Sequence, residues 1–350
     1  MIWQISNFTT IMKTLQLITF LGFWSIGFLA CSEKKEDVLI TPKPIISVGK
    51  TTFFIDPILK KANIISISFA NDNTIFAFGN NASQGYLFKS MDTGKTWNEV
   101  PFSLTNPTMN VVEFYDEKVG IIGGKTILGT KNGGVTWTVI PQLSSSISRI
   151  SYPKNQQGFM MKQIFDNVHS RKYTEIYPIN TNDLKTGTNY ITIDGYSNDI
   201  NFVRNKIGIS VGDLGNIYVI LIKPDGSFQY SDRLRPVNED LLSVFLVTEK
   251  LAFVGGKKGT FLKTINAGGT WVLTKTSITD NIKKIAFQNE NLGYGIVELE
   301  GKTTLYKIQE SGQKWTKIIT PETAIFNDLK INALGKAVAV GKDGAVYLFP

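Results

Sequence analysis

The octapeptide Ser90–Trp97, SMDTGKTW, combines a carboxylate with hydroxyl groups, and such a combination could do chemistry. Asp92 could act as a general base or as a metal ligand. Two close copies, 130–137 and 264–271, have asparagine in place of this aspartate. An amide cannot exchange a proton in catalysis, and one carboxylate per copy is too few to hold calcium. The exchange therefore favours a turn over a catalytic residue or a metal site.

The shared pattern, Ser/Thr-x-Asp/Asn-x-Gly-x-Thr-Trp, has the composition of a turn. A short side-chain oxygen can accept hydrogen bonds from backbone N–H groups, glycine can turn where a Cβ would clash, and tryptophan can pack between neighbouring units. A weaker fourth copy ends at Trp315. The predicted structural residues are Ser90, Asp92, Gly94, Thr96 and Trp97; Thr130, Asn132, Gly134, Thr136 and Trp137; Thr264, Asn266, Gly268, Thr270 and Trp271; and Glu310, Gly312 and Trp315.

The copies recur with a period near 40 residues. The tryptophans of the first two copies are 40 residues apart, and those of the last two are 44 apart. The interval of 134 residues between the second and third leaves room for two eroded copies, with Tyr190 and Tyr230 in the tryptophan place. A period of this length is typical of four-stranded propeller blades rather than of helical repeats.

The two ends of the chain are expected to share one blade. Glycine-containing turns such as 340–347 mark hairpins in the same phase as the octapeptides, and the last repeat lacks an outer strand. The extended segment 45–56 would complete that blade beside Ala345–Phe349 and cover two sheet edges. We therefore predict an all-β, seven-bladed β-propeller over residues 45–350, with six or eight blades as the alternatives.

The octapeptide resembles the Asp-box, or BNR repeat, of sialidases, sortilin-type receptors and other propellers. The longer run 256–271, a glycine turn and strand followed by the octapeptide, is similar to the photosystem II stability/assembly factor-like family. That resemblance covers about residues 50–350 and implies seven blades, with the octapeptides away from the central pocket. The arginine patch that photosynthetic members use is not evident, because the chain has only five scattered arginines. The resemblance therefore implies a non-photosynthetic bacterial member.

The amino-terminal segment predicts export and lipidation. An apolar run preceded by lysine leads directly to Cys31, the single cysteine, which resembles the lipobox of bacterial lipoproteins. We expect 1–30 to be a signal peptide, starting at Met1 or Met12, and 31–44 to be a flexible tether. An inert cysteine or a transmembrane anchor is the alternative. The predicted location is the bacterial cell envelope, as an outer-membrane lipoprotein attached to the membrane through its lipid.

Several classes of function are excluded by composition. The net charge of +8 comes mostly from dispersed lysines without interleaved aromatics, which argues against nucleic-acid binding. His169 is the single histidine, so a zinc site or a catalytic triad is not expected. A sialidase needs three arginines to clamp its substrate, yet no arginine precedes Arg149. We therefore expect no catalytic residue, no metal and no cofactor.

The remaining hypothesis is a binding scaffold. The interval between the second and third aromatic positions is the longest, which predicts an elongated hairpin near 157–173. We expect a monomeric, non-enzymatic scaffold or assembly factor for an unidentified protein partner; a glycan-binding or glycan-hydrolysing propeller is the alternative. The hairpin is either a plain surface excursion or a partner-contact loop. Its candidate contact residues are Lys162, His169, Arg171, Lys172 and Tyr173.

Overall fold

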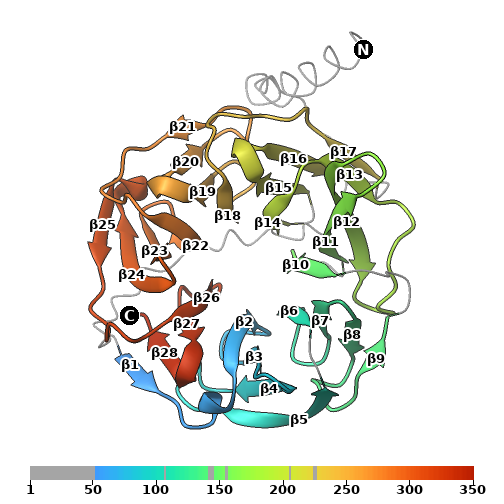
Figure 1. The fold of residues 1–350 in the computed structure, drawn as a ribbon, viewed down its shortest axis with the longest axis vertical. Helices are drawn as coiled ribbons and strands as arrows, with labels where there is room; N and C mark the ends of the chain where they lie inside the picture. Colours follow the sequence, from blue (N-terminus) through green and yellow to red (C-terminus); the bar gives the residue numbers. More distant parts are fainter. Residues whose placement is uncertain (1–51, 106–107, 141–145, 154–156, 205, 224–226) are drawn as a thin grey trace, which may run out of the picture. The chain divides into compact units, whose positions relative to one another are not determined.

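The computed structural model describes residues 52–105, 108–140, 146–153, 157–204, 206–223 and 227–350. Strands in these segments form seven antiparallel sheets of four strands each. The sheets are arranged as blades around a central axis (Figure 1). The predicted seven-bladed β-propeller is therefore confirmed, and the alternatives of six and eight blades are wrong.

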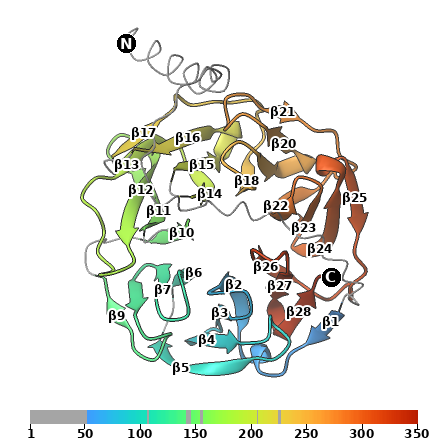
Figure 2. The same ribbon diagram turned by 180° about the vertical axis from the view of Figure 1, so that it is seen from behind.

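Each blade runs from an inner strand at the axis to an outer strand at the rim, as both views show (Figure 2). We number the blades 1 to 7 in the chain order of their inner strands. These are, in that order, β2 (Asn63–Phe69), β6 (Met109–Phe114), β10 (Ile147–Ser151), β14 (Ser197–Val203), β18 (Leu241–Leu246), β22 (Asn281–Asn289) and β26 (Phe326–Ile331). The second strands are β3 (Ile75–Asn80), β7 (Gly120–Gly124), β11 (Gln157–Asp166), β15 (Ile207–Gly212), β19 (Ala252–Gly256), β23 (Leu292–Leu299) and β27 (Ala337–Gly341).

The third and outer strands complete each sheet. The third strands are β4 (Gln84–Ser90), β8 (Ile127–Thr130), β12 (Arg171–Asn180), β16 (Ile217–Ile222), β20 (Phe261–Thr264), β24 (Lys302–Gln309) and β28 (Ala345–Leu348). The outer strands are β5 (Asn98–Thr105), β9 (Thr138–Val139), β13 (Ile191–Asp194), β17 (Phe228–Tyr230), β21 (Val272–Leu273), β25 (Lys314–Lys317) and β1 (Thr52–Ile55).

The ring is closed by β1, which comes from the start of the described chain and pairs with β28. Thr52 lies opposite Leu348, and Ile55 lies opposite Ala345 in this antiparallel pair. The backbone N–H of Asp56 continues the contact by donating to the carbonyl of Gly344 at 2.8 Å. The pairing covers an edge of the last blade that would otherwise be exposed. This is the closure predicted for the segment 45–56, of which residues 45–51 lie outside the described residues.

The hydrophobic core is divided among the seams between blades. Seven clusters of buried side chains lie in the described segments, and each cluster combines residues of two neighbouring blades. Second strands such as β27, AVAVG, are buried on both faces and are therefore almost wholly apolar. Outer strands such as β21 face solvent. Burial between blades, rather than inside one blade, makes the seven sheets depend on one another.

Several predictions concern residues that lie outside the described segments. Cys31, the signal peptide 1–30 and the tether 31–44 are among them. In the segments that the structure does describe, no helix is both long enough and apolar enough to span a bilayer. Those segments also contain no cluster of three or more histidine, cysteine or acidic side chains suited to a metal ion.

Candidate functional site

The inner strands place side chains at two equivalent positions per blade along the wall of the central channel. Every inner strand shifts register after its first or second residue, which marks a β-bulge. The residue after this shift and the residue two positions later face the same side because side chains alternate along a strand. The first position holds Ser66, Val111, Arg149, Asp199, Ser243, Lys284 and Asp328, and the second holds Ser68, Glu113, Ser151, Asn201, Phe245, Ala286 and Lys330.

Side chains at these positions tie several inner strands to the next. The Asp199 carboxylate accepts a hydrogen bond from the backbone N–H of Val244 at 3.1 Å. Ser243 Oγ, in the following blade, accepts from the N–H of Ile285 at 3.2 Å. These bonds satisfy inner-strand donors that face away from their own sheet. The channel wall is therefore held together by side chains as well as by the apolar seams.

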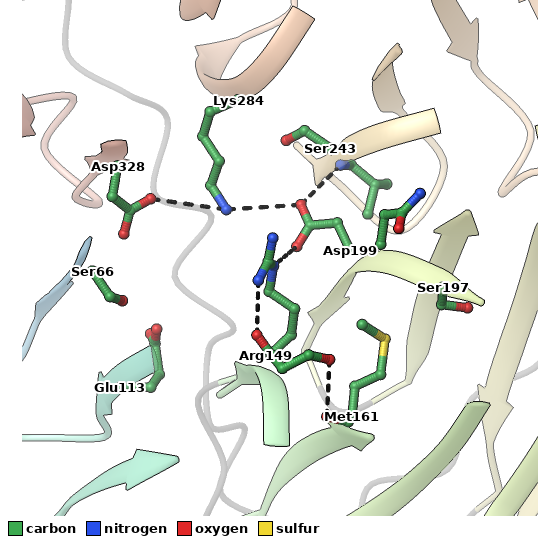
Figure 3. A network of polar contacts seen from close by, with 12 residues as sticks. Ser66, Glu113, Arg149, Met161, Ser197, Asp199, Ser243, Lys284 and Asp328 are labelled. Atoms are coloured by element: carbon green, nitrogen blue, oxygen red, sulfur yellow. Dashed lines mark hydrogen bonds and ion pairs between the residues drawn. The ribbon is translucent and has the colours of Figure 1, made fainter. Parts of the chain in front are cut away.

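A chain of opposite charges crosses the channel, and Figure 3 shows its centre. Lys284 Nζ lies 3.9 Å from a carboxylate oxygen of Asp199 and 3.8 Å from one of Asp328. Arg149 Nε approaches the other oxygen of Asp199 at 3.3 Å. Asp199 and Asp328 are buried, so their charges would be costly without these cations. Four residues from four blades are thereby coupled electrostatically.

A second pair joins the last blade, which carries Asp328, to β6 of blade 2. Lys330 Nζ donates to Glu113 at 2.9 Å. Burial raises the pKa of Glu113, and the Lys330 ammonium offsets this only in part. Burial lowers the pKa of Lys330, but the surrounding carboxylates, Glu113 first, outweigh it and leave that pKa raised. Lys330 therefore stays charged in the folded protein.

The channel residues stabilise one another and leave little room for a substrate. The space that they enclose has a volume of about 200 Å³. Burial holds the pKa of Tyr152 well above its usual value, so this phenol is a poor nucleophile, and its hydroxyl has no hydrogen-bond partner in the described residues. The geometry supports a structural role for the charged chain.

The octapeptides lie at the connection between the third and outer strands, away from the channel. In the first copy, Thr96 N donates to Asp92 Oδ1 at 2.9 Å, and Gly94 N donates to Ser90 Oγ at 2.8 Å. Trp97 Nε1 donates to the Gly94 carbonyl at 3.0 Å. Each of these contacts closes the turn on itself. The carboxylate is engaged with its own loop.

The second and third copies repeat the bonds to the Asp92 and Ser90 positions, with asparagine in place of aspartate and threonine in place of serine. The bond of the indole N–H recurs in the second copy but not in the third, where Trp271 Nε1 has no hydrogen-bond partner among the described residues. Thr136 N donates to Asn132 Oδ1 at 2.9 Å, the distance found at Asp92 in the first copy. Thr270 N and Asn266 Oδ1 repeat it at 2.9 Å. In the weaker fourth copy, Trp315 Nε1 donates to the Gly312 carbonyl at 2.8 Å. An amide oxygen and a carboxylate oxygen can both accept the hydrogen bond from the threonine N–H. This explains why asparagine replaces aspartate in two of the copies.

In the two eroded copies, the side chains that occupy the tryptophan place in the seam are not the tyrosines that the spacing predicts. Tyr190 directly precedes β13 and Tyr230 ends β17, but Tyr190 is 49% exposed and does not fill a seam. Leu184, only 6% exposed, occupies the seam between blades 2 and 3. Phe228 packs edge-on against Phe159 between blades 3 and 4, with ring centroids 5.8 Å apart. Leu184 comes from the connection between β12 and β13, which is longer than the corresponding connection in the octapeptide blades. The period of the repeat predicts the aromatic positions but not this leucine.

The predicted elongated hairpin is formed by β11 and β12, each ten residues long. Its neighbours are shorter: β10 reaches only Lys162, and β13 pairs only with Tyr173–Ile176. The end of the hairpin therefore extends beyond its own sheet. At this tip Val168 is 85% exposed, and Phe165 is also exposed. Large exposed apolar side chains on a protruding segment suit contact with another molecule.

The candidate contact residues occupy two regions of the hairpin. His169 Nδ1 lies 2.7 Å from Asp166 at the tip, and Arg171 pairs with Asp194 of β13. Lys172 Nζ lies 4.8 Å above the ring of Tyr196. Lys162, by contrast, lies at the base, where its ammonium is 3.4 Å from Glu175 and mostly covered. Tyr173, the fifth candidate, is half-buried in the third strand.

Comparison with known proteins shows a shared fold. No protein-family model matches the sequence, and no curated protein matches it. The solved structure "YCF48 bound to D1 peptide" has a TM-score of 0.64 and 18% identity, covering 87% of this chain and 98% of that chain. YCF48 from Cyanidioschyzon merolae has a TM-score of 0.62, 15% identity, and coverage of 85% and 98%. The WD40 β-propeller domain of Doa1 has a TM-score of 0.62, 10% identity, and coverage of 86% and 97%.

Proposed function

We propose that this protein is a non-enzymatic scaffold that binds a protein partner through the tip of the β11–β12 hairpin. The observation that carries the proposal is the exposure of Phe165 and Val168 beyond the edges of β10 and β13. A few anchor residues, among which aromatic side chains are enriched, supply most of the energy at protein interfaces, where they fill pockets of the partner.

The tip is held in place by the rest of blade 3 and by blade 4. Asp166 Oδ1 accepts from the N–H of Val168 at 2.9 Å, which fixes the turn. Gln163 Nε2 donates to the carbonyl of Ser197 at 2.7 Å, and Arg171 pairs with Asp194. A contact segment that is ordered before binding loses less entropy when the complex forms. These contacts therefore favour a binding role over an unsupported loop.

The channel supports a scaffold rather than an enzyme. Asp199, Asp328 and Glu113, the acidic side chains at its centre, are each engaged by a lysine or an arginine. A general acid or base must be free to reach a substrate atom. In this arrangement the three carboxylates instead form ion pairs that connect different blades. The structural neighbours are likewise an assembly factor and WD40 propellers.

The neighbour solved with a bound peptide gives the proposal a parallel in the same fold. YCF48 carries a D1 peptide in that structure. The likeness is one of fold, so it supports a propeller platform for polypeptides and does not identify this protein's partner.

The lipid anchor and the envelope location form the second part of the proposal. They rest on the apolar run before Cys31 and on the polar stretch after it. Mass spectrometry of the mature amino terminus tests them. A diacylated Cys31 is expected, and an unmodified cysteine would overturn the anchor without affecting the hairpin.

The scaffold is tested by comparing two surface substitutions in cells. Val168→Glu places a charge on the exposed tip, whereas Ile319→Glu makes the same change at an exposed site after β25 in blade 6. We expect recovery of specific partners to fall at least roughly tenfold for Val168→Glu and to stay at the wild-type level for Ile319→Glu. Equal recovery by both variants would contradict the role of the tip.

The glycan alternative has one observation in its favour. The rings of Tyr177 and Tyr190 stack with centroids 4.8 Å apart, and Tyr190 is half-exposed. The exposed ring of Tyr190 offers a flat face to a sugar ring as well as to a peptide. Binding of a glycan panel to the wild type and to Tyr190→Ala distinguishes a glycan ligand from a protein partner. Saturable glycan binding that the substitution abolishes would overturn the protein-partner proposal in favour of a glycan.

A further inference from the structure

A groove lies at the rim between blades 1 and 2, away from the hairpin tip. One side is formed by the outer strand β5, and the other by the octapeptide 130–137 of blade 2. Figures 1 and 2 both show β5 beside blade 2 at the outer edge of the ring. The groove has a volume of about 700 Å³. Clefts that bind small molecules or peptide side chains have volumes of roughly 300–1,000 Å³.

The lining of the groove exposes apolar side chains. Met91 is 66% exposed and Val135 is 71% exposed, and both belong to octapeptide turns. Val100 and Pro101 of β5 add further apolar surface. Position 91 holds methionine in the first copy while position 131 of the second holds lysine. The turn geometry therefore fixes where these side chains stand but does not require them to be apolar.

Three lysines line the same groove and have no ion-pair partner in the described residues. They are Lys89, Lys118 and Lys131. The groove also contains Glu99, but Lys61 from outside the groove is paired with that carboxylate. Glu117 accepts a hydrogen bond from Asn71 and remains the one unpaired acidic side chain in this lining. The groove therefore carries an excess of positive charge beside its apolar surface.

Backbone contacts hold together the two loops that form the wall on the blade 2 side. Gly133 N donates to the carbonyl of Lys118 at 2.9 Å, which joins the octapeptide turn to the hairpin between β6 and β7. Gly133 has a φ of +70°, and a Cβ there would lie 2.7 Å from the carbonyl oxygen of Glu117. This close approach needs glycine. It holds Lys118 and Lys131 on neighbouring, connected loops.

The edge of β5 favours recognition by side chains. Pro101 lies inside this outer strand and has no N–H to offer to an added strand. A register shift between Gly85 and Leu87 further distorts the β4–β5 pairing. A ligand in the groove would therefore be held by the lysines and by the apolar side chains rather than by extending the sheet.

We propose that this groove binds an acidic polypeptide segment with interspersed apolar side chains. The proposal rests on the scaffold function above and names the chemistry of a second contact with the protein partner. Carboxylates of the segment pair with Lys89, Lys118 and Lys131, and its apolar side chains cover Met91 and Val135. Complementary charge selects the partner and speeds its association, while the apolar contacts slow its release.

The test uses the purified full chain and a short fluorescent peptide of alternating glutamate and leucine. Fluorescence polarisation measures binding to the wild type and to a groove variant, Lys89→Glu/Lys118→Glu/Lys131→Glu. The matched control variant is Lys223→Glu/Lys250→Glu/Lys275→Glu, which makes the same change of charge at exposed lysines elsewhere. Thermal unfolding of each variant checks that the fold is retained. Val135→Asp tests the apolar contribution in a variant that keeps all three lysines.

We expect saturable binding to the wild type that is at least roughly tenfold weaker in the groove variant and unchanged in the control variant. Val135→Asp should also weaken binding, and salt should weaken binding to the wild type. A lysine–leucine peptide should not bind. Equal binding to both triple variants, or equal binding of a single-stranded DNA oligonucleotide, would overturn the proposal.

The hairpin variant separates this proposal from the scaffold function. Val168→Glu should bind the acidic peptide as the wild type does, because the tip and the groove belong to different blades. If Val168→Glu lowers partner recovery while the triple lysine variant binds the peptide as the wild type does, the scaffold function is supported and the groove proposal is wrong. If the groove variant loses the peptide while Val168→Glu leaves partner recovery unchanged, the contact through the tip is wrong.

Discussion

The Asp328 carboxylate accepts a hydrogen bond of 2.9 Å from the backbone N–H of Ile67, although 261 residues separate the two along the chain. Asp328 belongs to the inner strand of the last blade, and Ile67 belongs to that of the first. The bond therefore joins the two ends of the ring at its centre, while β1 and β28 join them at the rim.

Asp328→Ala should destabilise the protein by about 3–5 kcal/mol, because it removes a buried acceptor and leaves Lys284 and Lys330 with less compensating charge. Asp328→Asn keeps the oxygen for Ile67 and should cost less. Urea unfolding measures both free energies. Glu322→Ala, at an exposed acidic residue, is the control and should change stability by less than about 0.5 kcal/mol. A loss below about 1 kcal/mol in Asp328→Ala would show that the central charges do not hold the ring together.

Removal of residues 1–55 should expose the edge of β28 and lower the thermal stability of the ring. Phe53 would also be lost from its edge-on contact with Phe326, where the ring centroids are 6.4 Å apart. Size-exclusion chromatography should then show oligomers, because an open edge pairs with another copy. A shorter deletion, 1–44, keeps β1 and serves as the control. Monomeric, fully stable protein after the longer deletion would contradict closure by β1.

Asp92→Asn should retain most of the stability near neutral pH, since asparagine makes the same turn in two other copies. Burial raises the pKa of Asp92, but hydrogen bonds from Thr96 and Ser90 outweigh it and hold that pKa below its usual value. The carboxylate therefore adds stability above its unfolded pKa of about 3.9 and loses it as pH falls through the folded pKa. Unfolding measured between neutral and acidic pH should show the difference between wild type and Asp92→Asn shrinking in acid. A difference that grows there would refute the assignment.

Leu184→Ala should cost about 2–5 kcal/mol, because it leaves a cavity in the seam between blades 2 and 3. Tyr190→Ala is the matched comparison and should cost much less, since Tyr190 is half-exposed. Chemical denaturation of the two variants ranks them directly. A larger loss of stability in Tyr190→Ala than in Leu184→Ala would mean that the tyrosine stabilises the seam, as the repeat spacing predicts.

The sequence was sufficient for the fold because the octapeptide repeats a local pattern. Ser90, Asp92 and Trp97 bond within their own turn, so their types and spacing remained readable in three copies. The same period located blade 3 but not Leu184, because the seam needs only an apolar side chain of suitable size, which a longer loop could supply from another position.

The channel charges were not predictable in this way. Arg149, Asp199 and Lys284 stand at equivalent positions in three inner strands, yet each contact depends on what the other blades carry. No local pattern marks such a set, because the partners lie in different blades, far apart in sequence. The elongated hairpin was visible as surplus length, whereas its exposed tip, Phe165 and Val168, emerged only from the register of β10 and β13.

The most direct test of the scaffold is site-specific photo-crosslinking in cells. A photoreactive amino acid replaces Val168 at the hairpin tip in one strain and Ile319, an exposed position in another blade, in a second strain. Mass spectrometry then identifies the adducts. We expect one protein to crosslink at position 168 and not at position 319. Identical adduct patterns at both positions, or none at 168, would contradict partner binding through the tip.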